Sequence, residues 1–65
     1  MKMTMEEANS ALKLFNCHLS RRESYYESKD YIYYISNTDD IAQELGYWSR
    51  DDVSEVYKYV VDNYL

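Results

Sequence analysis

The apolar side chains near the C-terminus recur with the spacing of one face of an α-helix. In chain order they are Val53, Val56, Tyr57, Val60, Val61 and Tyr64. They occupy positions i, i+3, i+4, i+7, i+8 and i+11, the pattern that a single buried helix stripe produces. Ser49 is a suitable N-cap residue, and Asp52 lies where its carboxylate can reach back to it. The sequence therefore predicts a helix over 50–64 packed against the rest of the chain.

A second amphipathic stretch lies near the N-terminus. Thr4 followed by Glu7 is a capping-box pattern, which favours a helix start at this point. The apolar residues that follow at helical spacing are Met5, Ala8, Leu12, Phe15 and Leu19. We expect a helix over 5–20 that buries this stripe. The stripe also leaves open a coiled-coil contact between two copies of the chain.

The middle of the chain is rich in aromatic and β-branched residues, which favour strands. They are Tyr25, Tyr26, Tyr31, Ile32, Tyr33, Tyr34 and Ile35. The polar segment from Glu27 to Asp30 separates two such runs, so the pattern predicts a β-hairpin of 23–27 with 31–35. A continuous helix over 22–35 is the alternative, because no proline or glycine interrupts this stretch.

The single glycine, Gly46, suggests the end of another helix. Ser36, Asn37 and Thr38 are good N-cap residues, and Ile41, Ala42 and Leu45 would form the buried side of a short helix over 39–45. Gly46 would then follow it in the left-handed conformation. The expected fold is α+β, one domain over residues 1–65 with an N-terminal helix, a β-hairpin and then two helices. An all-α bundle is the alternative.

The run from Asp40 to Val56 resembles a helix-turn-helix motif. The matching positions are Ile41, Ala42, Leu45, Gly46 and Val53, and the turn length is similar to that of LexA-type repressor domains. The resemblance, over residues 40–60, implies that the helix from Arg50 would enter a DNA major groove. It places Arg50, Asp51, Ser54 and Glu55 nearest the bases. Its functional implication is a dimeric, DNA-binding transcriptional regulator.

The charge distribution favours a different function. The net charge is −5, and residues 1–35 are neutral, with five acids against five bases. Residues 36–65 carry seven acids against Arg50 and Lys58, so the whole excess lies in this half. Such a surface repels the phosphates of nucleic acids and attracts basic protein surfaces. We therefore expect a protein partner with a basic surface rather than direct nucleic-acid binding.

The sequence contains no recognisable catalytic or cofactor-binding set. Cys17 and His18 are the only cysteine and histidine, too few for a zinc site, and they are expected to be an ordinary half-buried thiol and a surface imidazole. The acidic pairs 39–40 and 51–52 lack the spacing of a calcium loop and suit the first turns of helices. We expect no enzyme activity, no metal and no cofactor. The N-terminal sequence lacks a signal-peptide pattern, and no stretch has membrane-spanning length, so a cytoplasmic protein is expected.

Nine tyrosines and one tryptophan exceed what so small a core needs. Tyrosine and tryptophan are common in interface hot spots, where they supply large contact areas with few rotatable bonds. The hypothesis is a small acidic inhibitor, of a phage or plasmid type, that mimics DNA and blocks restriction, CRISPR or transcription machinery. A homodimer stays open. The candidate partner-binding residues are Asp40, Glu44, Tyr47, Trp48, Asp51, Asp52, Glu55, Tyr59 and Asp62.

Overall fold

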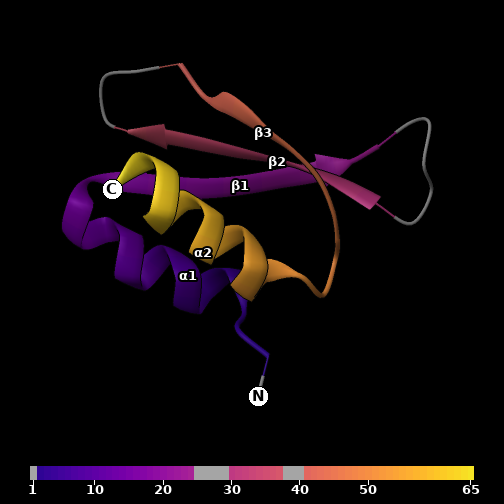
Figure 1. Ribbon diagram of the computed structural model, residues 1–65, viewed down its shortest axis with the longest axis horizontal. Helices are drawn as coiled ribbons and strands as arrows, with labels where there is room; N and C mark the ends of the chain where they lie inside the picture. Colours follow the sequence, from indigo (N-terminus) through magenta and orange to yellow (C-terminus); the bar gives the residue numbers. More distant parts are fainter. Residues whose placement is uncertain (1, 25–29, 38–40) are drawn as a thin grey trace.

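The computed structural model describes residues 2–24, 30–37 and 41–65. These residues form two α-helices, a single 3₁₀ turn and a three-stranded antiparallel sheet with strand order β1-β2-β3. The elements are α1 (Met5–Leu12), η1 (Lys13–Phe15), β1 (Cys17–Glu23), β2 (Asp30–Asn37), β3 (Gln43–Ser49) and α2 (Val53–Tyr64). Both helices lie on the same face of the sheet (Figure 1).

The first helix begins as predicted and ends earlier. The Thr4 hydroxyl accepts a hydrogen bond from the Glu7 N–H, and the Glu7 carboxylate accepts one from the Thr4 N–H, so the capping box is formed. The predicted helix over 5–20 is wrong after Leu12, where α1 ends and η1 begins. Asn16 then takes the left-handed conformation with φ 59°, which asparagine tolerates and which turns the chain into β1.

Strand pairing around β2 differs from the expected hairpin. The predicted strand over 31–35 is part of β2, but its partner is β1 from Cys17 to Glu23, in a register that pairs Leu19 with Ile35 and Arg21 with Tyr33. Residues 25–27, the other part of the expected hairpin, lie outside the described residues. Leu19 is buried as expected, although it projects from a strand rather than from a helix. Phe15, which was predicted on the same buried stripe, is exposed.

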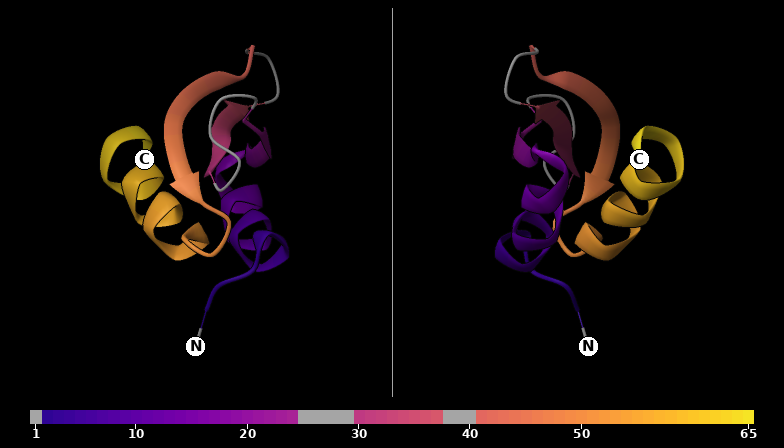
Figure 2. Two further views of the ribbon diagram at one scale, coloured as in Figure 1. Left: turned by 90° about the vertical axis from the view of Figure 1, so that its right-hand side faces the viewer. Right: turned by 90° about the vertical axis from the view of Figure 1, so that its left-hand side faces the viewer.

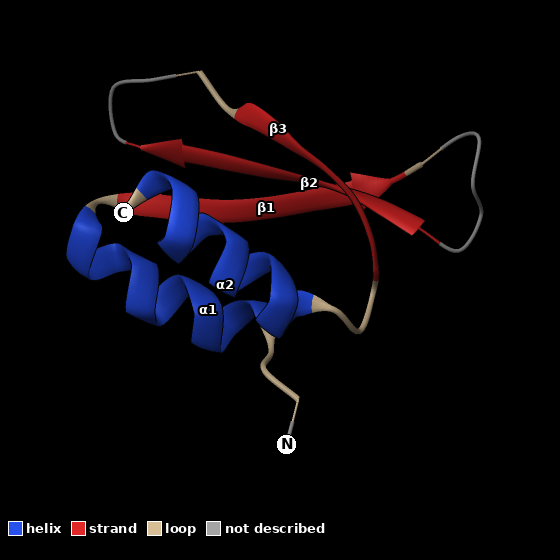
Figure 3. Ribbon diagram, in the orientation of Figure 1, coloured by secondary structure: helices blue, strands red, loops and turns tan. Residues whose placement is uncertain are grey.

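The largest correction concerns the segment before Gly46, predicted as a helix over 39–45. Residues 43–49 form the strand β3, which lies beside β2 (Figure 3). It pairs Gly46 with Tyr33 and Trp48 with Tyr31. The expected hairpin followed by two helices is therefore replaced by helix, three strands and helix, and a helix-turn-helix over 40–60 is not formed. Gly46 does have a positive φ, 134°, but it lies beside a register shift in β3 rather than behind a helix.

The C-terminal helix is the best-predicted element. It begins at Val53 rather than at residue 50, with Asp52 at the N-cap position. The predicted contact between Ser49 and Asp52 as a capping box is not made; the Ser49 hydroxyl instead accepts from the Asp51 N–H at 3.3 Å. Val53, Val56 and Val60 are buried as the periodicity indicates, and Tyr57 is half-buried. Val61 and Tyr64, which the same pattern predicted on the buried face, are exposed.

The core lies between the sheet and the two helices. It is formed by Ala8, Leu12, Leu19, Tyr33, Ile35, Val53, Val56 and Val60. Each structural element except η1 and β3 contributes to this buried set, and β3 adds the partly buried Leu45 and Trp48. The two end-on views show α2 on the side of β3, and α1 beneath β1 (Figure 2).

Candidate partner-binding surface

Trp48 connects the core with the surface of α2. Its ring packs edge-on against the buried Tyr33, with centroids 6.0 Å apart, because Trp48 and Tyr33 project from the helix-facing side of adjacent strands. On its other side, Trp48 lies 5.5 Å from the ring of Tyr59, and Tyr59 lies 6.3 Å from Tyr64. These rings form a continuous row that runs from the core to the solvent.

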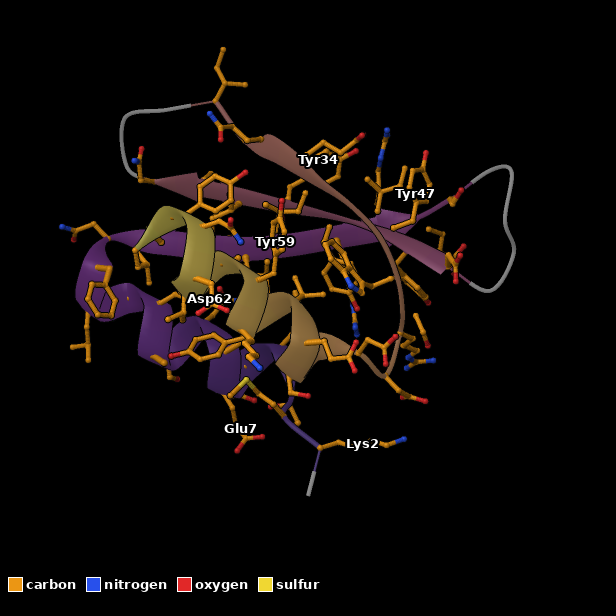
Figure 4. All side chains as sticks on the ribbon, viewed as in Figure 1. Lys2, Glu7, Tyr34, Tyr47, Tyr59 and Asp62 are labelled. Carbon is orange, nitrogen blue, oxygen red and sulfur yellow. The ribbon has the colours of Figure 1, made fainter. Side chains whose placement is uncertain are left out.

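Acidic side chains flank this aromatic row. Trp48, Glu55, Lys58, Tyr59, Asp62 and Asn63 line an open groove of about 370 Å³ between β3 and α2. Both Tyr59 and Asp62 are exposed on α2, with Tyr59 on the side toward the sheet (Figure 4). Two carboxylates and one ammonium group give the groove a negative balance. Four of the predicted partner-binding residues, Trp48, Glu55, Tyr59 and Asp62, are thus brought together.

Asp51 and Asp52 lie apart from this groove. Asp51 forms an exposed ion pair with Lys2 at 3.5 Å, and the depression around it is also lined by Arg21 and Arg50. Its charge is therefore partly balanced by neighbouring bases. Asp52 is half-buried at the N-cap of α2, where a carboxylate interacts favourably with the helix dipole. Of the predicted partner-binding acids Asp51, Asp52, Glu55 and Asp62, the groove beside Trp48 thus includes only Glu55 and Asp62.

Glu44 and Tyr47 project from the opposite face of β3. In the strand register, Tyr47 pairs with Ile32 and Glu44 with Tyr34. Tyr34 and Tyr47 are on the side of the sheet away from the helices (Figure 4). Glu44 and Tyr47 belong to the same strand as Trp48, but a partner would contact them from the opposite face of the sheet. Asp40 lies outside the described residues.

The sequence analysis assigned no role to Arg22, which packs on the sheet face away from the helices. The Arg22 guanidinium lies over the Tyr34 ring, 5.7 Å from its centroid, a cation–π contact. Ile32 pairs with Arg22 on one side and with Tyr47 on the other, and it is only 7% exposed although it lies on the face opposite the helices. The alternation of β1 and β2 could have predicted this, had β1 been recognised as a strand.

Cys17 and His18 are placed as the sequence suggested. Cys17 is half-buried, and its thiol donates to the Phe15 carbonyl oxygen at 3.4 Å. His18 is exposed, and as its strand neighbour it projects to the opposite face of the sheet. The two side chains therefore do not converge on one site.

Within residues 2–24, 30–37 and 41–65, no group of three or more histidine, cysteine or acidic side chains is arranged to hold a metal ion. No helix of the described chain is sufficiently long and apolar to cross a bilayer. Comparison of the chain with protein-family models, with curated proteins and with solved structures found no match. The functional argument therefore depends on the surface itself.

Proposed function

We propose that this chain is a small acidic inhibitor that binds the nucleic-acid-binding surface of a partner protein. The observation that carries the proposal is the Trp48–Tyr59 pair, with Glu55 and Asp62 beside it in one groove. An aromatic anchor supplies contact area, and the carboxylates stand where a nucleic acid would present phosphates. A basic groove that normally holds DNA or RNA offers the complementary charge.

Charge balance supports a protein partner over DNA. The groove side chains number two acids against one base, Lys58, and phosphate binding depends on an excess of lysine and arginine. A basic protein surface, in contrast, gains from each carboxylate, mainly through faster association at low salt. Restriction, CRISPR and transcription machinery are proteins with such surfaces, and they are the targets we infer.

The test compares two double variants with the same net charge. E55K/D62K removes the acids of the groove, and E6K/E23K removes exposed acids of α1 and β1; both change the net charge from −5 to −1. Immobilised wild-type chain is used to capture proteins from a bacterial lysate, with and without duplex DNA as a competitor. The captured protein is then purified and titrated against each variant.

We expect duplex DNA to displace the captured protein, since both would occupy the same surface. We expect E55K/D62K to weaken its binding by about tenfold or more, and E6K/E23K to have a much smaller effect. A wild-type chain that binds labelled duplex DNA itself, and an E55K/D62K variant that binds it more tightly, would contradict the proposal and favour a DNA-binding regulator.

A further inference from the structure

The two outer strands of the sheet, β1 and β3, differ in whether the main-chain groups at their free edges have hydrogen-bond partners. At β1, the Asn9 side-chain oxygen accepts from the Leu19 N–H at 2.6 Å, and the Asn9 amide nitrogen donates to the Leu19 carbonyl oxygen at 2.9 Å. A neighbouring strand would make these same two bonds. Asn9, which projects from α1, therefore takes the place of a strand at the centre of this edge and closes it.

The same bonds determine which main-chain groups point toward β3. Because the Leu19 N–H and C=O point toward Asn9, Leu19 and Ile35 form a pair without mutual hydrogen bonds. Ile35 therefore directs its main-chain groups away from β1 and toward β3. Main-chain direction alternates along a strand, so Tyr33 and Tyr31 also point toward β3.

On β3, Gly46 and Trp48 face Tyr33 and Tyr31, and Tyr47 lies between them. The N–H and C=O of Tyr47 therefore point to the free edge. Tyr47 is 49% exposed, and no side chain or loop of the described residues hydrogen-bonds to its main chain. Among residues 2–24, 30–37 and 41–65, this edge therefore has no equivalent of Asn9, and it is open at Tyr47.

The open stretch is short and has defined ends. The Ser49 carbonyl oxygen already accepts from the Tyr33 hydroxyl at 2.9 Å and from the Asp52 N–H at 3.1 Å. The register shift between Tyr33 and Tyr34 distorts the ladder near Leu45. The strand contains neither lysine nor proline, residues that commonly prevent edge pairing. Pairing with another strand is thus centred on Tyr47.

The acidic side chains around this edge favour pairing with a basic strand. Glu44 flanks the edge on one face of the sheet, and Glu55 and Asp62 line the groove on the other. A second copy would bring a further net charge of −5 to the interface, so charge repulsion between the copies opposes this pairing. A strand with basic side chains would instead meet carboxylates on both of its faces.

We propose that β3 binds an extended segment of the partner by strand addition, and that this segment carries lysine or arginine on both of its faces. Main-chain bonds to Tyr47 hold the segment, while its alternate side chains reach the groove of Glu55 and Asp62 on one face and Glu44 on the other. This inference rests on the proposed function and names the part of the partner that is recognised.

The experiment removes one outward N–H without changing a side chain. The chain is made by chemical synthesis with an N-methyl group on Tyr47, and a control carries the N-methyl group on Glu23, an exposed residue of β1 whose main chain points away from β2. Circular dichroism checks that both fold. The probe is a short peptide in which pairs of lysines alternate with pairs of threonines, so that a strand of it carries lysine on both faces. It is titrated by calorimetry and by amide NMR.

We expect N-methylation of Tyr47 to weaken peptide binding by about tenfold, and N-methylation of Glu23 to leave it unchanged. We also expect the Tyr47 amide of the unmodified chain to exchange more slowly in the complex. Equal binding by the Tyr47 variant, together with loss of binding by E55K/D62K, would overturn strand addition and leave the proposed function standing.

Two other results would also overturn the inference. Failure of the peptide to bind the unmodified chain would exclude a basic extended segment as the ligand of β3. The capture experiment with duplex DNA as competitor would still test the proposed function separately. Sedimentation showing a dimer of the unmodified chain that is lost on N-methylation of Tyr47 would assign the edge to a second copy.

Discussion

Arg21 donates through Nη1 to the hydroxyl of Tyr33 at 3.1 Å, which joins β1 to β2 through their side chains. The same nitrogen donates to the Arg50 carbonyl oxygen at 2.9 Å, and the Tyr33 hydroxyl donates to the Ser49 carbonyl oxygen. The guanidinium also lies over the ring of Tyr31, 5.1 Å from its centroid. These contacts hold the turn before α2 against the sheet, and so they position α2 and its groove.

Replacement of Tyr33 by phenylalanine should destabilise the fold by about 1–2 kcal/mol, because the Ser49 carbonyl and Arg21 lose a buried partner. Tyr33 is fully buried, so water cannot substitute without rearrangement. Urea denaturation measures the effect. Y64F is the control, since Tyr64 is exposed and no hydrogen bond of its hydroxyl is found within the described residues. Equal stability of the two variants would contradict the network.

Asn9→Ala should cost about 1–2 kcal/mol, because the Leu19 N–H and C=O lose the partner that closes the β1 edge. The variant should also associate at high concentration, since an open edge pairs with other chains. Denaturation and sedimentation measure the two effects. N63A is the matched control, because Asn63 only donates to the Tyr59 carbonyl on an exposed helix surface. A similar, small loss of stability in both variants would show that the hydrogen bonds of Asn9 to Leu19 do not stabilise the β1 edge.

Val56 and Val60 were predicted to lie in the core, and both are fully buried. Truncation of either to alanine should cost about 1–3 kcal/mol through lost apolar burial and the cavity left behind. V61A, at an exposed position of the same helix, should have a far smaller effect. Thermal unfolding of the three variants tests which face of α2 is buried. A larger destabilisation by V61A than by the other two would show that the buried face is not the one with Val56 and Val60.

Gly46→Ala should destabilise the protein by about 1 kcal/mol or more, because a φ of 134° is one that side-chain-bearing residues rarely adopt. The added Cβ would also lie 3.4 Å from Cζ3 of Trp48, close to the aromatic row. Denaturation curves and the fluorescence of Trp48 measure the two effects. An unchanged stability would indicate that β3 can relax to an ordinary strand conformation.

Tyr59→Ala should weaken binding of the captured partner by about tenfold, the effect expected at an aromatic hot spot. The fold should be retained, since Tyr59 is 39% exposed and lies outside the buried stripe. Trp48 is the only tryptophan, so its fluorescence reports binding directly. F15A is the control, because Phe15 is an exposed aromatic residue of η1 that does not line the groove. Equal loss in both variants would place the binding surface elsewhere.

The sequence predicted best where a structural signal is contained in a few neighbouring residues. The Thr4–Glu7 capping box lies within one helical turn, and it formed as predicted. The buried stripe of α2 depends on the spacing of Val53, Val56 and Val60, which a helix converts directly into one face. Of the candidate site, Glu55, Tyr59 and Asp62 were placed correctly on the exposed part of that helix for the same reason.

The tertiary structure decided the segments whose local signals allow more than one element. Residues 41–45 have the apolar pattern and following glycine of a helix end, yet Gln43 and Glu44 pair with Ile35 and Tyr34 of β2, and Trp48 gains the core as a strand residue. Likewise, Leu19 fits both a helix stripe and a strand, and its pairing with Ile35 decides for the strand. Such partners lie eight or more residues away in the sequence, and the free energy of pairing overrides local propensity. The sequence by itself thus determined the two helix faces, while non-local pairing formed the sheet, its open edge and the groove beside Trp48.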